Sequence, residues 1–343
     1  QHGFDQLLSS LGQPSEDIQI LDERSFWRRA RLLPNGDILA IHTHHSLIKL
    51  SLESMLIWAY PERVHHDLDV GPDGRIYTLI NEKKVLPRIH PSNEVSEDFV
   101  VVLDAEGREL KRVSLLEAAE RAGIVEILRG LPRRGDLFHA NAVELLDGRL
   151  ADAIPAFAAG NLLVSLLLVN TIAVLDLESE ELVWWQQGNY RLQHDPSVLD
   201  DGRLLVFDNF GPALGETERN LGRGHYQHVW HTNIVSEELP VQPASAVLEV
   251  DPRTGQVMWS YRGTPERFFS SETCGAAERL PNGNTLIVET QFGRAFEITR
   301  EKETVWEFVS PHVIGDNVAR LFDLVRVPEA SLEWLKRGRR AGD

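Results

Sequence analysis

A repeated turn constrains this chain more than any other feature: an Asn-Gly or Asp-Gly dipeptide separates two apolar segments. The segment Leu32–Leu39 (LLPNGDIL) returns as Leu280–Ile287 (LPNGNTLI), and looser copies are centred on Gly74, Gly148 and Gly202. Asn-Gly and Asp-Gly supply the positive φ angles that a two-residue hairpin turn needs. We therefore expect a series of hairpins with two-residue turns.

A second hairpin follows each copy of the first: an apolar strand, an acidic turn and a strand that usually carries tryptophan, as at Trp58, Trp184, Trp259 and Trp306. Two hairpins make a four-stranded sheet, which is the repeating blade of a β-propeller. Five units are visible, at about 30–60, 64–113, 138–185, 193–261 and 275–308. We expect a sixth to be closed by 317–328 together with strand residues before Trp27. The predicted fold class is thus all-β, a six-bladed β-propeller with an incomplete or unusually closed last blade.

The predicted domain organisation is a single propeller over 27–328. Residues 1–26 are expected to form an N-terminal extension or a remnant of the closing blade, and 329–343 a C-terminal helix or tail. A helix-like stretch at Leu115–Leu128 and a polar loop at 211–243 are expected as insertions between strands. Because the chain begins with Gln1, we expect a processed product or a fragment.

Composition excludes several functional classes. The formal net charge of −17 argues against nucleic acid and anionic membrane surfaces as partners. The single cysteine, Cys274, excludes an internal disulfide framework and a thiolate metal cluster. No run of 18 apolar residues is present, so no membrane insertion of this chain is expected.

Three of the units open with histidine: His65-His66-Asp67, His139-Ala140-Asn141 and Gln193-His194-Asp195. His66, His139 and His194 precede the next turn glycine by 8, 9 and 8 residues. Near-equal offsets in repeated units place equivalent side chains at one end of the central channel, so we expect the three rings to share a small volume. They fit histidines satisfied within their own blades, a three-histidine zinc site, or a catalytic group.

Other candidates have weaker patterns. His42, His44 and His45 are expected at solvated edge positions, whereas His225, His228 and His231 fit either metal binding or a loop that covers substrate. Asp208-Asn209 and Phe268-Phe269 fit either an aryl pocket or ordinary blade packing.

The ordered set of motifs resembles the bacterial, nucleotide-independent arylsulfotransferases. It comprises His65-His66-Asp67, His139-Ala140-Asn141, Val164-Ser165 to Asp176, Gln193-His194-Asp195 to Asn209, and Leu280 to Glu297. The resemblance implies a six-bladed propeller and a ping-pong transfer of sulfuryl from an aryl sulfate to a phenol through a sulfohistidine. It implies His194 as nucleophile, His139 and Asn141 as the pair that holds the sulfate oxygens, and His66, or less well His65, as acid or base. Asp195 is a further candidate for substrate binding.

The sequence departs from the family pattern at Leu167, where the family carries an arginine that clamps the sulfate. Loss of such a donor typically costs a factor of roughly 10²–10³ in rate. Arg191, Arg149 and Arg63 are the candidate substitutes, with Arg191 preferred, and Arg191→Ala should abolish transfer if that assignment is right. Because of this departure, a second possible function is that of a catalytically impaired propeller that binds an anionic or aromatic ligand. A third, suggested by the three histidines, is that of a metal-dependent hydrolase or lyase.

We therefore expect a sulfotransferase with no cofactor and no metal, acting on a small-molecule aryl sulfate and a phenol. A homodimer is the assembly to test. The resemblance implies a periplasmic or otherwise extracytoplasmic location.

Overall fold

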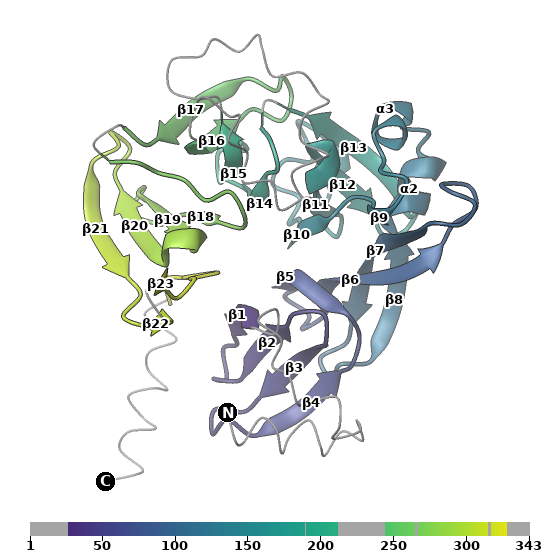
Figure 1. Ribbon diagram of the computed structural model, residues 1–343, viewed down its shortest axis with the longest axis horizontal. Helices are drawn as coiled ribbons and strands as arrows, with labels where there is room; N and C mark the ends of the chain where they lie inside the picture. Colours follow the sequence, from purple (N-terminus) through teal and green to yellow (C-terminus); the bar gives the residue numbers. More distant parts are fainter. Residues whose placement is uncertain (1–26, 189, 212–243, 265–266, 315–316, 328–343) are drawn as a thin grey trace.

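The structure is a computed structural model that describes residues 27–188, 190–211, 244–264, 267–314 and 317–327. Within these residues the chain forms five four-stranded antiparallel sheets that follow one another around a central axis (Figure 1). In every sheet the spatial order of the strands is their order in the sequence, and the first strand is the innermost. The prediction of an all-β propeller is therefore confirmed.

The blades are as follows. Blade 1 contains β1 (Trp27–Leu32), β2 (Ile38–His42), β3 (Ser46–Leu50) and β4 (Leu56–Tyr60). Blade 2 contains β5 (Val64–Val70), β6 (Ile76–Val85), β7 (Glu94–Leu103) and β8 (Glu109–Ser114), with the short β9 (Gly135–Asp136) paired parallel to β7. Blade 3 contains β10 (Ala140–Leu145), β11 (Leu162–Leu166), β12 (Thr171–Asp176) and β13 (Glu181–Gln187). Blade 4 contains β14 (His194–Val198), β15 (Leu204–Gly211), β16 (Ala244–Val250) and β17 (Val257–Arg262). Blade 5 contains β18 (Ala276–Arg279), β19 (Thr285–Glu289), β20 (Arg294–Ile298) and β21 (Thr304–Val309).

The prediction of six blades is wrong for the residues described, because no sixth four-stranded sheet forms among them. After β21 the chain makes only a two-stranded hairpin, β22 (Val313–Ile314) and β23 (Asn317–Val318). It then continues as a single segment, 319–327, which we call the closing segment. Residues 1–26, which the prediction also assigned to the sixth blade, lie outside the described residues, as do 328–343 and the loop 212–243.

The closing segment contacts both ends of the ring of blades. Leu321 donates its backbone N–H to Thr290 O in blade 5, and Leu321 and Leu324 pack against the blade 5 cluster of Ala276, Val288 and Ala295. On its other side, Asp323 forms an ion pair with Arg29 of β1. One extended segment thus connects the last blade to the first where the sequence predicted a sheet.

The turn between the first two strands also differs from the prediction. In blade 1 the Gly36 N–H donates to Leu33 O, and the Leu33 N–H donates to Asp37 O. Gly36 has φ 93°, whereas Asn35 is not among the residues with positive φ. This is a type I turn completed by a left-handed glycine, in place of a two-residue turn with two left-handed positions. The expected hairpin is present, but its glycine alone requires the left-handed conformation.

The insertion between blades 2 and 3 is helical, as predicted, but it forms two short helices: α2 (Leu115–Arg121) and α3 (Val125–Arg129). Ser114 caps α2 by accepting the backbone N–H of Glu117 through its side chain. Gly123, at φ 66°, separates the two helices. The other helical pieces among the described residues are the single 3₁₀ turns η1 (Pro155–Phe157), η2 (Leu167–Val169) and η4 (Thr290–Phe292). In the described part of the chain, no helix has the length and apolarity that crossing a membrane requires.

Neighbouring blades are joined by carboxylates on the innermost strands. Asp67 of β5 accepts the backbone N–H of Val143 in blade 3, and Asp195 of β14 accepts that of Ala277 in blade 5. Glu144 of β10 accepts the N–H of Val198 in blade 4. Because each carboxylate satisfies a backbone donor of the next blade, these contacts fix the spacing of the innermost strands around the axis.

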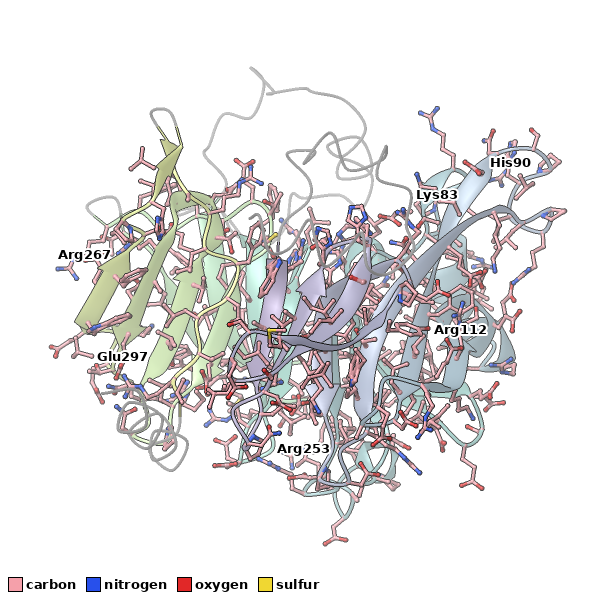
Figure 2. The ribbon with its side chains drawn as sticks, turned by 90° about the horizontal axis from the view of Figure 1, so that it is seen from below. Lys83, His90, Arg112, Arg253, Arg267 and Glu297 are labelled. Atoms are coloured by element: carbon pink, nitrogen blue, oxygen red, sulfur yellow. The ribbon has the colours of Figure 1, made fainter. Side chains whose placement is uncertain are left out.

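The start of β5 identifies the end of the ring at which the histidines gather. Val64 pairs with Ile80, so β5 begins where β6 and β7 extend into a projecting hairpin. Lys83 and His90 mark this end in Figure 2, whereas Arg253, between β16 and β17, marks the opposite end. The histidine motifs therefore open onto the end of the ring that carries the β6–β7 hairpin.

Candidate functional site

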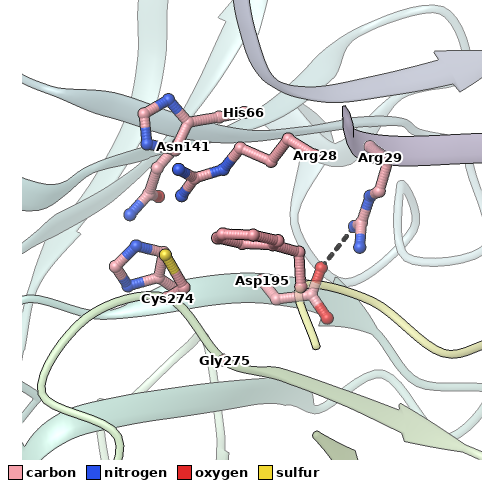
Figure 3. A pocket seen from close by; sticks show the side chains of 9 residues that line it. Arg28, Arg29, His66, Asn141, Asp195, Cys274 and Gly275 are labelled. Carbon is pink, nitrogen blue, oxygen red and sulfur yellow. Dashed lines mark hydrogen bonds and ion pairs between the residues drawn. The ribbon is translucent and has the colours of Figure 1, made fainter. Parts of the chain in front are cut away.

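A pocket at this end of the ring is built from equivalent positions of the five innermost strands. Its cavity volume is about 30 Å³, and Figure 3 shows it from close by. Each blade contributes one residue at an equivalent position: Arg28, His66, Asn141, His194 and Gly275. Each precedes the turn glycine of its own blade by eight residues, or by seven for Asn141. Arg29, Asp195, Cys274 and Phe322 complete the lining.

The backbone at the start of these strands departs from regular β geometry. The strand register shifts between His65 and Leu68 and between His194 and Ser197. His66 has φ 60° and Asp195 has φ 48°, a left-handed conformation that is uncommon for residues other than glycine. Such β-bulges redirect side chains and are frequent near functional sites. The regular sheet geometry is thus interrupted at residues whose side chains line the pocket.

His194 is held in one tautomer by Asn209. The two N–H groups of the Asn209 amide donate to Ser271 O at 2.6 Å and Cys274 O at 2.5 Å, so its Oδ1 faces His194 Nδ1 at 2.8 Å as an acceptor. Nδ1 therefore carries the proton, and Nε2 keeps its lone pair. Burial, followed by the positive charge of Arg28, lowers the pKa of His194 to about 3. At neutral pH the ring is therefore uncharged.

His66 and His65 lie in direct contact. Their Nδ1 atoms are 2.8 Å apart, and the His66 ring centroid lies 6.4 Å from that of His194. His66 Nε2 is buried and has no hydrogen-bond partner among the described residues. Burial, followed by the charge of Arg28, lowers the pKa of His66 well below its usual value. His65 is not a pocket-lining residue, and it places its Nε2 3.4 Å from the buried carboxylate of Asp98 on β7.

His139 approaches the same group without lining the pocket. Its ring centroid lies 4.7 Å from that of His66, and its Nδ1 lies 2.7 Å from Asp136 Oδ2. Burial raises the pKa of the Asp136 carboxyl, but the hydrogen bond and charge of His139 outweigh burial and lower it. The rings of His66, His139 and His194 therefore lie close together. Among them, His139 is the one whose ring nitrogen contacts a carboxylate, that of Asp136.

The positive charge in the pocket comes from β1, which the sequence analysis did not consider. Arg28 lines the pocket, and Figure 3 shows its guanidinium directed toward Asn141. Among the described residues no carboxylate forms an ion pair with Arg28. Arg29 differs, because it pairs with Asp67, Asp195 and Asp323 at 2.7, 2.5 and 3.2 Å. Asp195, a predicted substrate ligand, is thus paired with Arg29 inside the pocket lining.

The arginines named from the sequence lie elsewhere. Arg191 is not among the pocket-lining residues, and its backbone N–H donates to Asp208. Arg149 pairs with Asp147 and Asp200, and Arg63 donates to Asn81. Leu167, the position of the family arginine, is fully buried in η2 and packs with Leu192 and Phe210.

The other predicted residues divide between roles in the site and in packing. Asn141 lines the pocket, donates from Nδ2 to Gln193 O, and has a buried Oδ1 with no partner in the described part of the chain. Phe269 belongs to an apolar cluster with Phe207 and Phe296, away from the pocket lining. His42 is buried and stacks on His45, so the prediction of solvated edge positions is wrong for His42. His225, His228 and His231 lie outside the described residues.

The site contains no arrangement suited to a metal ion within the described residues: no group of three His, Cys, Asp or Glu side chains there has a geometry that would hold one. The described residues instead bring together the uncharged imidazole of His194, the His66 imidazole, whose Nε2 has no partner among them, and the guanidinium of Arg28. Groups of these kinds serve in the transfer of small anionic groups.

Arg28 was not predicted because the spacing to the turn glycine was counted only from histidines. The eight-residue interval that connects His66 to Gly74 and His194 to Gly202 also connects Arg28 to Gly36. The same count in the fifth blade gives Gly275, where an added Cβ would lie 2.4 Å from the Phe207 ring. Counting eight residues back from the turn glycine of every blade, whatever the residue type, would have identified both positions from the sequence.

Comparisons with known proteins give a family match and several distant structural likenesses. A protein of unknown function from Bacteroides caccae is 12% identical, with 84% of this chain and 82% of that chain covered and a TM-score of 0.49. A virginiamycin B lyase from Staphylococcus aureus is 11% identical over 85% of this chain and 72% of that chain, with a TM-score of 0.46. No curated protein matches the sequence significantly. The family model described as arylsulfotransferase matches residues 33–311, which is most of the chain. The chain therefore belongs to the arylsulfotransferase family.

Proposed function

We propose that this protein transfers a sulfuryl group from an aryl sulfate ester to a phenol through a sulfohistidine at His194. The observation that carries the proposal is the state of His194. The Asn209 contact keeps the proton on Nδ1, and a low pKa keeps the ring uncharged, so Nε2 is a nucleophile in a pocket lined by Arg28. Family membership supports the same reaction class.

The chemistry follows from the groups in the pocket. His194 Nε2 attacks sulfur as the bond from sulfur to the aryl oxygen breaks, and the released aryloxide takes a proton from His66. Sulfuryl transfer, like phosphoryl transfer, depends mainly on in-line positioning and on donors aimed at the equatorial oxygens. In the second half, the phenol acceptor returns a proton to His66 and takes the sulfuryl group from His194.

Arg28 is the proposed substitute for the family arginine. It reaches the pocket from β1 and lacks a carboxylate ion pair in the described chain, so its charge is available for a sulfate. The second N–H of Asn141 is a further donor, because only one is used by Gln193 O. This assignment replaces the sequence-based preference for Arg191.

The test is direct detection of the intermediate. The protein is incubated with 4-nitrophenyl sulfate without acceptor, kept alkaline and digested, and the peptide that contains His194 should gain the mass of one sulfuryl group. His194→Ala should abolish both the gain and nitrophenol release, while the surface His90→Gln variant serves as a control. A folded protein that releases nitrophenol with no modification at His194 would show that the reaction takes another route.

A second candidate function is binding of an anionic aromatic ligand without turnover. It is favoured by the burial of Leu167 in an apolar cluster, which removes the family arginine from its usual place. It predicts saturable binding of aryl sulfate that depends on Arg28, with no nitrophenol release over many hours. The extracytoplasmic location remains a proposal that rests on the family alone.

A further inference from the structure

The proposed reaction leaves a buried chain of three side chains behind the pocket without a role. Asp98 Oδ1 lies 3.4 Å from His65 Nε2, and neither atom has a hydrogen-bond partner in the described chain. His65 Nδ1 lies 2.8 Å from His66 Nδ1. His66 lines the pocket, and its Nε2 is buried and also has no hydrogen-bond partner among the described residues. Asp98 and His65 are each only 1% exposed.

The buried chain meets a specific need of the reaction. His66 must give a proton to an aryloxide, but burial and Arg28 lower its pKa far below neutrality, so the imidazolium form is scarce. His65 has the same limitation, because burial lowers its pKa to about 3. An uncharged imidazole gives up a proton readily only if another group returns one to its second nitrogen at the same time. Asp98 is suited to supply it, since burial, followed by the charge of Asp136, raises its pKa to about 8.

We propose that Asp98, His65 and His66 form a proton relay that delivers a proton to the leaving aryloxide and recovers it from the acceptor phenol. The proposal rests on the proposed sulfuryl transfer for the identity of the groups that exchange the proton. In this relay Asp98 and His65 act through His66, and only His66 touches the substrate.

The proton count balances at each step. Before transfer, the Asp98 carboxylic acid donates toward His65 Nε2, His65 Nδ1–H donates to His66 Nδ1, and His66 Nε2 carries the proton that faces the pocket. As the sulfur–oxygen bond breaks, His66 Nε2–H protonates the aryloxide, each proton shifts by one position, and Asp98 becomes a carboxylate. The acceptor phenol reverses every shift when it attacks the sulfohistidine. Neither imidazole becomes a cation at any stage.

Charged and titratable neighbours face this chain from several elements. Asp98 faces Asp136 on β9 and His139; His65 faces His44 in the β2–β3 turn, His139, Asp136 and Arg28; His66 faces Arg28, His139 and His194. Arg28 and the histidines disfavour a second positive charge here, whereas Asp136 disfavours a second negative one. Both effects keep the three groups uncharged before transfer, and Asp98 becomes charged only as the aryloxide takes its proton.

The kinetic test compares Asp98→Asn with the wild type on two donors. Phenyl sulfate needs a proton on its leaving group, whereas 4-nitrophenyl sulfate, whose phenol is far more acidic, needs little help. We expect Asp98→Asn to slow transfer from phenyl sulfate by about 100-fold and transfer from 4-nitrophenyl sulfate by less than about 5-fold. In the wild type, transfer from phenyl sulfate should fall as the pH rises above 8, because ionised Asp98 no longer holds the proton.

Glu144→Gln is the matched control. Glu144 is a buried carboxyl on β10 whose pKa burial also raises to about 8, and it bonds to Val198 N without contacting a histidine. It should leave the ratio of the two donors unchanged. His65→Gln should reproduce the donor-dependent loss, which covers the case in which Asp98→Asn folds poorly.

A measurement independent of turnover separates this relay from the sulfuryl transfer itself. ¹⁵N NMR of the imidazoles should show His66 Nε2 change from protonated to bare as the pH rises through 8, and Asp98→Asn should remove that change. An unchanged His66 tautomer across this pH range, or an equal loss on both donors, would overturn the relay even if His194 is sulfated. Absence of sulfation in a protein whose His66 does switch would instead overturn the proposed function.

Discussion

At the residue scale, the identity of the cation beside the histidines decides how a sulfate is held. Arg28 lines the pocket and its charge contributes to the low pKa of both His66 and His194, whereas Arg191 is absent from the lining. We expect Arg28→Gln to reduce kcat/KM for 4-nitrophenyl sulfate by about 100- to 1000-fold, the usual effect of losing a preorganised donor. Arg191→Gln, measured in parallel by nitrophenol release, should change it by less than about 5-fold. A larger loss of kcat/KM in Arg191→Gln than in Arg28→Gln would mean that Arg191, and not Arg28, binds the sulfate.

Arg28 also shows why the resemblance alone could not complete the site. The family match begins at residue 33, so β1 lies before the matched residues, and motif comparison offers no candidate there. His66, Asn141 and His194 were predictable because they belong to quoted motifs, and the structure places all three in the lining. The roles of Asn209 and Asp98 depend on hydrogen bonds between distant strands, which no spacing along the chain reveals.

At the element scale, the glycines of the repeat have two different functions. Gly283 closes the first hairpin of blade 5 at φ 87°, and no atom of the described residues lies within 4 Å of an added Cβ. Gly275 opens the innermost strand of the same blade at φ 109°, where an added Cβ would lie 2.4 Å from Phe207. Gly283→Ala should therefore cost about 1 kcal/mol of unfolding free energy from backbone strain, and Gly275→Ala about 2–4 kcal/mol from strain plus overpacking. Urea unfolding measures both, and equal costs would contradict the steric role of Gly275.

The same repeat explains which elements were predictable. Turn glycines and alternating apolar strands recur in every unit, and all five predicted units became blades. The sixth was predicted from 317–328 together with strand residues before Trp27, but the described part, 317–327, forms only β23 and the closing segment, and no four-stranded sheet. The closing segment is a single stretch that is held by the hydrogen bond from the Leu321 N–H to Thr290 O and by the ion pair of Asp323 with Arg29. Its sequence contains no repeated pattern from which these contacts could be predicted.

At the scale of the whole molecule, one guanidinium connects parts of the ring that are far apart in sequence. Arg29 binds Asp67 of blade 2, Asp195 of blade 4 and Asp323 of the closing segment, with 19% of its side chain exposed. Burial lowers the pKa of Arg29, but Asp67 and then Asp323 and Asp195 outweigh burial and raise it well above its usual value. Since the three carboxylates would be left together without a cation, Arg29→Met should cost about 3–5 kcal/mol of unfolding free energy.

Closure of the ring then depends on Asp323 in a way that can be measured locally. Asp323→Asn removes one of the three ion pairs and should speed hydrogen exchange within 319–327, while β5 and β14 keep their protection because Asp67 and Asp195 still bind Arg29. Arg326→Gln is the control: Arg326 pairs with Glu297 but is 52% exposed, so its loss should cost less than about 1 kcal/mol and leave exchange in the segment nearly unchanged. Equal exchange in the two variants would mean that apolar packing of Leu321 and Leu324, and not the central ion pairs, holds the closing segment in place.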